Sequence, residues 1–247
     1  MSSPNQPAIL GGTPAIPADT LHGWPPVTEV DEAYVLASLR GGNHAFGPNC
    51  VAFEEEFAAW NGNQFAITTN SGTAALHMCI AACGCSEGDE VIVTAYSWSS
   101  SATCILHHNC IPVFVDIDFD TINIDVTKVE AAITPKTKAI IVVHLHGLAV
   151  DMDAVMAIAA KHGLMVIEDV RQSHGAFKGK KVGTLGHCGV SFNQNKNLCS
   201  GEGGMFVTDN EELWHKAQPL VLWRDARRWK HAIITPMRSV GCTATTT

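Results

Sequence analysis

Short apolar runs alternate with segments of helical periodicity from residue 66 to residue 167, and this alternation restricts the fold more than any other feature of the sequence. The apolar runs predict strands at residues 66–68, 90–93, 111–115, 139–143 and 164–167. The segments between them predict helices at residues 71–83, 100–107, 126–133 and 152–162. Strands that are apolar on both faces and alternate with helices indicate an α/β fold, a mostly parallel sheet with helices on both faces. Ligands of such sheets bind beyond the carboxyl ends of the strands.

The segments that flank this region differ in composition. Residues 1–26 are rich in Gly, Pro and Thr and predict an N-terminal arm. Helices are expected at residues 30–39, closed by Gly41 and Gly42, at residues 53–60 and at residues 211–217. We therefore expect an arm over residues 1–26, a large domain over residues 27–231, and a tail over residues 232–247 in which the apolar period is lost.

The composition excludes several classes of protein. Hydrophobic residues make up 46% and charged residues 16% of the 247 residues, which is typical of a globular domain. Sixteen basic and 24 acidic residues give a net charge of 16 − 24 = −8, which argues against a nucleic-acid-binding protein. No apolar stretch is long enough to cross a bilayer. The nine cysteines, an odd number in mostly apolar surroundings, indicate free thiols and a cytoplasmic protein.

Four segments carry candidate functional residues. Asp169 follows the apolar run LMVI in the segment EDVRQSHGA. Lys196 lies in SFNQNKNLCSGEGG, whose glycines allow close approach of the backbone to a ligand, and burial there would lower the pKa of its amine. The segment NSGT at residues 70–73 opens a helix and is either a simple N-cap or a phosphate-binding turn. Trp98 follows a strand and is either a core residue or a platform for a planar ligand.

Taken together, these segments resemble the DegT/DnrJ/EryC1/StrS family of pyridoxal-phosphate (PLP) aminotransferases over roughly residues 8–230. The resemblance implies a PLP-dependent transferase fold of type I, like that of aspartate aminotransferase, with a large parallel-sheet domain and a small C-terminal domain. It also implies the site residues: Lys196 as the Schiff-base lysine, Asp169 as the partner of the pyridinium, Gln172 on the ring hydroxyl, Ser191, Gly72 and Thr73 on the phosphate, and Trp98 stacked on the ring.

The same resemblance implies the reaction and the assembly. Family members transfer an amino group from glutamate or glutamine to a keto-sugar or keto-cyclitol, in amino-sugar, aminocyclitol or antibiotic biosynthesis. They form homodimers with shared active sites. Lysine at position 196 argues against the related sugar dehydratases, in which histidine replaces it.

Two departures from the family pattern stand out. Val170 and Arg171 occupy positions where the family usually has small residues. The chain also stops where the small domain is expected to begin, and a shifted reading frame beyond about residue 232 would restore a segment that resembles the family. We therefore expect the chain as given to be C-terminally truncated and not a competent transaminase, and the alternative is an inactive fragment that binds PLP or dimerises only.

A metal site is the remaining alternative. His144 and His146 follow an apolar strand, and Cys83, Cys85 and Cys110 lie elsewhere in the chain. Their spacing matches no recognised zinc pattern, so no metal is expected. The segment HLHG is instead expected to be a loop that lines the cleft.

Overall fold

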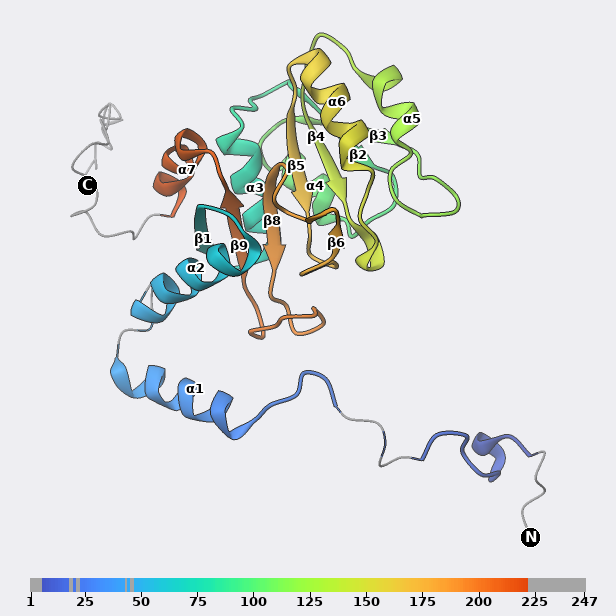
Figure 1. Cartoon of the computed structure of the whole chain (residues 1–247), viewed down its shortest axis with the longest axis vertical. Helices are drawn as coiled ribbons and strands as arrows, with labels where there is room; N and C mark the ends of the chain where they lie inside the picture. The colour runs from blue at the N-terminus through green and yellow to red at the C-terminus, as the bar shows by residue number, and fades with distance from the viewer. Residues whose placement is uncertain (1–5, 18–19, 21–22, 43, 45–46, 222–247) are drawn as a thin grey trace, which may run out of the picture.

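The computed structural model describes residues 6–17, 20, 23–42, 44 and 47–221 (Figure 1). Its helices are α1 Glu29–Gly41, α2 Pro48–Asn61, α3 Gly72–Ala82, α4 Ser100–Leu106, α5 Val126–Val129, α6 Met152–His162 and α7 Glu211–Ala217. Its strands are β1 Phe65–Thr69, β2 Glu90–Thr94, β3 Ile111–Val115, β4 Thr137–Val143, β5 Met165–Asp169, β6 Phe177–Lys178, β7 Lys180–Lys181, β8 His187–Ser191 and β9 Gly204–Thr208. The expected tail at residues 232–247 lies outside the described residues.

Seven of the strands form one mixed sheet in the order β1-β9-β8-β5-β4-β2-β3. Parallel pairing joins β3 to β2, β2 to β4, β4 to β5 and β5 to β8, whereas β9 pairs antiparallel with both β8 and β1. The expectation of a mostly parallel sheet is confirmed. Because only β9 runs against the others, the carboxyl ends of the other six strands meet at one edge, and β9 begins at that edge.

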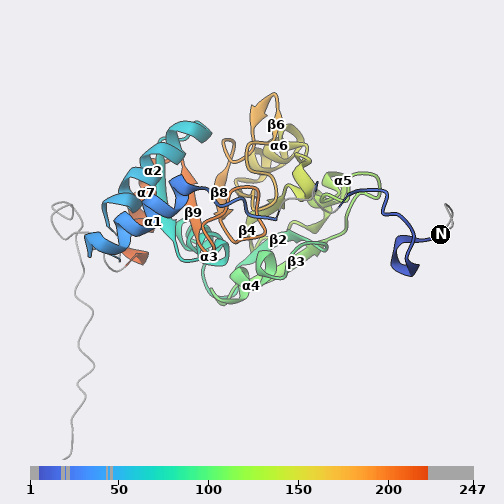
Figure 2. The same cartoon turned by 90° about the horizontal axis from the view of Figure 1, so that it is seen from below.

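Alternate side chains of the central strands fill cores on opposite faces of the sheet. Val91 and Val93 of β2 pack in a cluster with α3, α4 and α7, whereas Ile92 between them packs with α5 and α6. A third cluster places α2 against β8 and β9. Figure 2 shows α3 and α4 on one side of the sheet and α2 and α6 on the other. Helices therefore cover both faces, as the apolar pattern predicts.

Several elements differ from the expected ranges. The strand expected at residues 164–167 extends to Asp169, so this aspartate is the last residue of β5 and does not follow it. The helix expected at residues 126–133 divides into α5 and a 3-10 turn, Glu130–Ala132. The sequence did not predict β8, β9 or the short β6–β7 hairpin.

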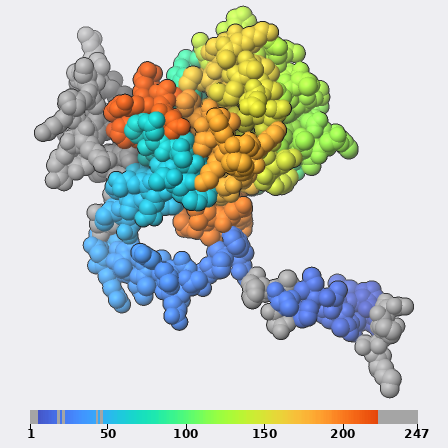
Figure 3. All heavy atoms as spheres, in the orientation of Figure 1, coloured from blue at the N-terminus to red at the C-terminus, as the bar shows by residue number. Residues whose placement is uncertain are grey.

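The N-terminal helix α1 stands away from the sheet (Figures 1 and 3). Thr28 and Asp31 form a capping box at its start, and Gly42 adopts the left-handed conformation at its end. None of its residues is buried, and large apolar side chains such as Val30, Tyr34 and Leu39 are exposed. In the described part of the chain, no helix combines the length and the apolar character needed to traverse a membrane.

Candidate functional site

A cavity of about 380 Å³ opens at the carboxyl edge of the sheet, where sequence reasoning placed the site. The loop after β2, the start of α3 and the loop between β8 and β9 all contribute to its wall. The residues that line it are Ser71, Gly72, Thr73, Trp98, Arg171, Ser191, Asn193, Asn195, Lys196 and Glu202. Five of the seven predicted residues, namely Gly72, Thr73, Trp98, Ser191 and Lys196, are therefore brought together.

Asp169 lies at the end of β5 behind this cavity and is completely buried. Its carboxylate accepts hydrogen bonds from the hydroxyl of Ser101 at 3.0 Å, from Nε of Arg171 at 2.7 Å and from the Arg171 backbone N–H at 3.2 Å. Burial opposes ionisation of this carboxyl, but the charge and hydrogen bonds of Arg171 outweigh burial and hold the pKa of Asp169 below its ordinary value. Asp169 is thus a carboxylate held ionised in a dry environment.

Arg171 is the most important residue that sequence reasoning did not assign to the site. The residue is only 6% exposed, yet it forms part of the cavity wall. The guanidinium forms an ion pair with Asp169 and donates hydrogen bonds to the hydroxyls of Ser100 and Ser101 in α4. The one signal in the sequence was the unusual size of this residue at a position where small residues are expected.

The turn before α3 has the geometry expected of a phosphate-binding helix start. Ser71 is the N-cap, and its hydroxyl accepts the backbone N–H of Ala74 at 3.1 Å. The first N–H groups of a helix have no partner within the helix, so those of Gly72 and Thr73 are available to an anion. A Cβ atom on Gly72 would lie 2.6 Å from both Cδ of Arg171 and Cβ of Ser191. Only glycine permits this close approach, which leaves the turn against the end of β8.

The loop between β8 and β9 presents Lys196 to the same cavity. Backbone hydrogen bonds close this loop, including Phe192 N–H to Gly203 at 2.9 Å and Lys196 N–H to Asn193 at 2.9 Å. Asn193 also donates from its amide to Glu202 at 2.7 Å. Burial, followed by the positive charge of Arg171, lowers the pKa of Lys196. A lysine amine with a lowered pKa is the nucleophile that imine chemistry requires.

Of the two remaining side chains, Trp98 lies at the cavity and Gln172 does not. Trp98 lines the cavity and is 69% exposed, so it is not a core residue. Gln172 does not line the cavity, and its side-chain oxygen accepts the backbone N–H of His146 at 3.4 Å. Gln172 therefore contacts the loop that follows β4, and its assignment to the ring hydroxyl stays a prediction.

Residues 26–241 match the DegT/DnrJ/EryC1/StrS aminotransferase family. The chain belongs to this family. It is 45% identical over 190 residues to the spore coat polysaccharide biosynthesis protein SpsC of Bacillus subtilis, and the match covers 76% of this chain and 49% of SpsC. It is 46% identical over 170 residues to the L-glutamine:2-deoxy-scyllo-inosose aminotransferase of Streptoalloteichus tenebrarius, and the match covers 68% of this chain and 40% of that enzyme.

A solved structure has the same architecture over the half that is present. The structure of NtdA from Bacillus subtilis with bound cofactor PMP superposes with a TM-score of 0.72 at 34% identity, covering 87% of this chain and 49% of NtdA. The chain spans about half the length of the curated relatives it matches. The family membership and the fold therefore rest on the half that is present.

The residues present satisfy most of the needs of the cofactor that the family implies. The turn at Gly72 offers free N–H groups beside the Ser191 hydroxyl, and Lys196 lies on the same cavity wall. Asp169 is an ionised carboxylate at the strand edge, which is the partner that a protonated pyridine nitrogen requires. The point of difference is that the guanidinium of Arg171 already engages this carboxylate.

One of the two histidines considered as metal ligands has other contacts. His144 is buried, accepts the backbone N–H of Val150 at Nδ1, and lies 3.1 Å from Glu168 through Nε2. Because Nδ1 is an acceptor, Nε2 is the donor to Glu168. Within the residues described, no group of three or more His, Cys, Asp or Glu side chains is arranged to hold a metal ion.

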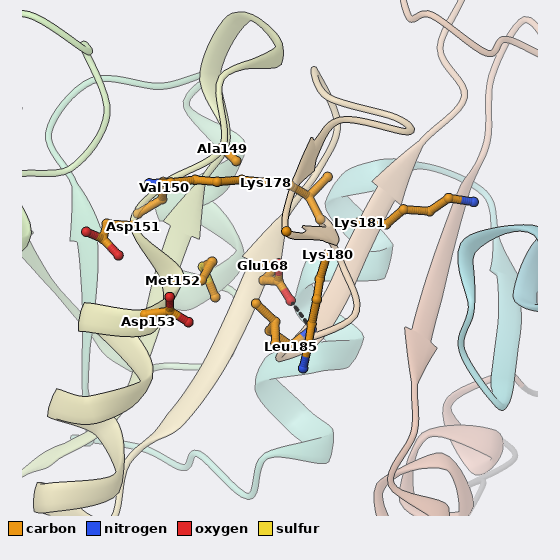
Figure 4. A pocket seen from close by; sticks show the side chains of 12 residues that line it. Ala149, Val150, Asp151, Met152, Asp153, Glu168, Lys178, Lys180, Lys181 and Leu185 are labelled. Atoms are coloured by element: carbon orange, nitrogen blue, oxygen red, sulfur yellow. Dashed lines mark hydrogen bonds between the residues drawn. The ribbon is translucent and has the colours of Figure 1, made fainter.

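Glu168 belongs to a second cavity on the other side of β5 (Figure 4). This cavity of about 270 Å³ lies between the start of α6 and the β6–β7 hairpin, and Lys178, Lys180 and Asp151 are among its lining residues. Glu168 accepts three backbone N–H groups, from Gly183 at 2.8 Å, Leu185 at 2.9 Å and Gly186 at 2.6 Å. The lysines around it are exposed surface groups, so this cavity has no built ligand site.

Proposed function

We propose that this protein is the cofactor-binding half of a PLP-dependent aminotransferase that acts on a keto-sugar or keto-cyclitol with glutamate or glutamine as amino donor. The observation that carries the proposal is the convergence of Lys196, the Gly72 turn and Ser191 on one cavity, directly in front of the buried Asp169. The substrate class follows from relatives named for amino transfer from L-glutamine to 2-deoxy-scyllo-inosose and for GDP-perosamine synthesis. Amino-sugar, aminocyclitol or antibiotic biosynthesis is the corresponding setting.

Each residue has a defined task in this proposal. Gly72, Thr73 and Ser191 bind the phosphate through N–H groups and a hydroxyl, against an overall charge that disfavours anions. Trp98 covers one face of the ring, and Asp169 keeps the ring nitrogen protonated. The bound cofactor supplies the electron sink that makes the α-carbon of the donor acidic. Lys196 holds the cofactor and then moves the proton between that carbon and the cofactor.

We further propose that the protein assembles as a homodimer. Trp98 at the cavity, and Val30, Tyr34 and Leu39 on α1, are more than half exposed in the single chain. Exposed apolar groups around an open site and along a helix without buried residues favour a second copy as the partner. Sedimentation at increasing concentration tests this proposal, and a monomer at every concentration contradicts it.

We place the protein in the cytoplasm. The eight cysteines in the described part of the chain are free, and five of them are buried. Free buried thiols are typical of reducing compartments.

Trapping of the cofactor on Lys196 tests the proposed function. Incubation with PLP is expected to give an absorption band in the visible region, and borohydride is expected to attach the cofactor irreversibly to Lys196. Peptide mapping identifies the labelled residue, and Lys196→Ala, which removes only the amine and its stem, serves as the control. Label on the exposed Lys161 or Lys180 in place of Lys196 contradicts the assignment.

The donor is tested with the same preparation. Discharge of the visible band by L-glutamine or L-glutamate supports transamination by this chain, because either donor converts the cofactor to its aminated form. A band that forms on Lys196 but resists both donors supports the alternative, a chain that binds PLP without transamination.

A further inference from the structure

Arg171 donates hydrogen bonds to both oxygens of the Asp169 carboxylate, the group that the cofactor needs. One oxygen of Asp169, Oδ1, accepts both Nε and the backbone N–H of Arg171 at 2.7 and 3.2 Å. The other oxygen, Oδ2, accepts the Ser101 hydroxyl at 3.0 Å and Nη2 of the same guanidinium. Both oxygens are thus engaged from within the protein, in the two-point geometry that arginine and carboxylate prefer.

The position of Arg171 separates Asp169 from the cavity. Arg171 lines the cavity wall, whereas Asp169 does not reach it and is 0% exposed. The side-chain stem of Arg171 passes close to Gly72 and Ser191, and the guanidinium extends from there to α4 and Asp169. Any ligand in the cavity therefore meets the side chain of Arg171 before it meets the carboxylate.

We propose that Arg171 is the resident counter-ion of Asp169 and that the ring nitrogen of the cofactor must displace its guanidinium, so that residue 171 sets the affinity of the site for the pyridine ring. This inference rests on the proposed function, because it assumes that a pyridine ring enters this cavity. A protonated pyridine nitrogen and a guanidinium are both cationic donors that require the same carboxylate oxygens. Binding of the ring breaks the charge-assisted pair between Arg171 and Asp169 and forms one between the ring nitrogen and Asp169. The free energy of the broken pair therefore weakens the binding of the ring.

Removal of the Arg171 charge is expected to give a measurable gain in affinity for a pyridine ring. Hydrogen bonds to charged groups contribute about 1.5–3 kcal/mol, and a factor of ten in affinity corresponds to about 1.4 kcal/mol. Arg171→Gln keeps a polar side chain that extends only as far as Nε of arginine, and it removes the charge. We expect this variant to bind a pyridine-ring ligand at least about tenfold more tightly than the unchanged protein.

Pyridoxine is the appropriate probe, because it carries the ring nitrogen but neither the aldehyde that reacts with Lys196 nor the phosphate. Its dissociation constant is measured by NMR titration of the full chain, for the unchanged protein, Arg171→Gln, Asp169→Asn and the double variant. The expected result is tighter binding by Arg171→Gln, with the gain absent when Asp169 is also replaced. An unchanged or weaker affinity overturns the proposal. A gain that persists without the Asp169 carboxylate also overturns it, because the gain then comes from extra space in the cavity.

Two further measurements keep the test decisive. Arg171→Lys retains a charge in the site but loses the two-point geometry, so we expect an affinity between those of Arg171→Gln and the unchanged protein. This variant decides the question if the loss of charge prevents folding. Borohydride trapping of PLP is carried out in parallel. Label on Lys196 with no gain in pyridoxine affinity refutes only the inference about Arg171, whereas no label on Lys196 in any variant refutes the proposed function.

Discussion

Glu168 and Asp169 are consecutive, buried carboxylates at the end of β5, but their partners are of different kinds. Glu168 is held by three backbone N–H groups of residues 183–186, which are fixed by the course of the chain, and by the buried side chain of His144. Asp169, on the opposite side of the strand, is held mainly by the side chains of Arg171 and Ser101. Side chains can change rotamer without moving the backbone. The comparison teaches that Glu168 stabilises the fold, whereas Asp169 can exchange its partners for a ligand.

Replacement of Glu168 is expected to lower the stability of the fold. Glu168→Gln places an amide NH2 group where one carboxylate oxygen now accepts N–H donors, so at least one buried donor loses its acceptor. We expect the free energy of unfolding to fall by about 3 kcal/mol, the upper end of the cost of a buried donor left without its acceptor. Urea denaturation measures it. Glu87→Gln, at an exposed position, is the matched control, and a similar small loss in both variants would remove the distinction between the two carboxylates.

Replacement of Asp169 is expected to act mainly on the cofactor. Asp169→Asn removes the charge that keeps the pyridine nitrogen protonated, so we expect the affinity for PLP to fall by roughly 100-fold, about 2.7 kcal/mol, and the half-reaction to cease. It is also expected to lower the stability, because the guanidinium of Arg171 keeps its serine partners but loses the carboxylate of a buried ion pair.

Asp151→Asn provides the control for this substitution. Asp151 caps α6 by accepting the N–H of Ala154 at 3.3 Å, and asparagine caps a helix equally well. We expect no change in PLP affinity. Equal and small effects of the two substitutions contradict the assignment of Asp169.

The stability contributed by Glu168 and Asp169 depends on pH only under acidic conditions. Burial opposes ionisation of Glu168, but its bond to His144 and the backbone N–H groups hold the pKa of Glu168 below its ordinary value. Both carboxylates therefore stay ionised in the native protein through weakly acidic conditions, and their contribution is lost only as the pH falls below the ordinary carboxyl range, about 4.

His174, which lies on the same side of β5 as Asp169, makes the stability depend on pH over a higher range than the two carboxylates do. Burial, followed by the charge of Lys196, lowers the pKa of His174 to about 4. Between about pH 6.5 and 4 the unfolded chain binds a proton that the folded protein does not, so stability falls as the pH is lowered, by at most about 1.4 kcal/mol per pH unit. Below pH 4 this contribution is constant. Urea denaturation at several pH values is expected to show a shallower slope for His174→Gln, and an unchanged slope assigns the effect to another group.

Much of the fold could be predicted because its elements have clear periods. The strand at residues 111–115 and the helix at residues 152–162 have the predicted bounds, since their apolar patterns are unambiguous. The strands β8 and β9 were missed because they contain glycine and because their segments were interpreted for chemistry and not for pairing.

The site could be predicted only in part for a different reason. Motifs identified Lys196, Ser191, Gly72 and Thr73, because their residue types and order are distinctive. The contact of Arg171 with Ser100 and Ser101 joins positions about 70 residues apart, and no local pattern encodes it. Sequence reasoning recognised Arg171 as unusual but could not place its guanidinium on Asp169.

The place of β9 in the sheet fixes when the site can form during synthesis on the ribosome. β9 lies between β8 and β1, and it pairs Thr208 with Phe65, two residues separated by most of the domain. Until β9 has left the exit tunnel, β1 and the Gly72 turn that follows it have no strand to connect them to β8. Closing so long a segment of chain is slow, and β1 stays unpaired meanwhile. The Gly72 turn and Ser191 at the end of β8 therefore come together only after β9 has joined the sheet, so the complete site forms late in synthesis.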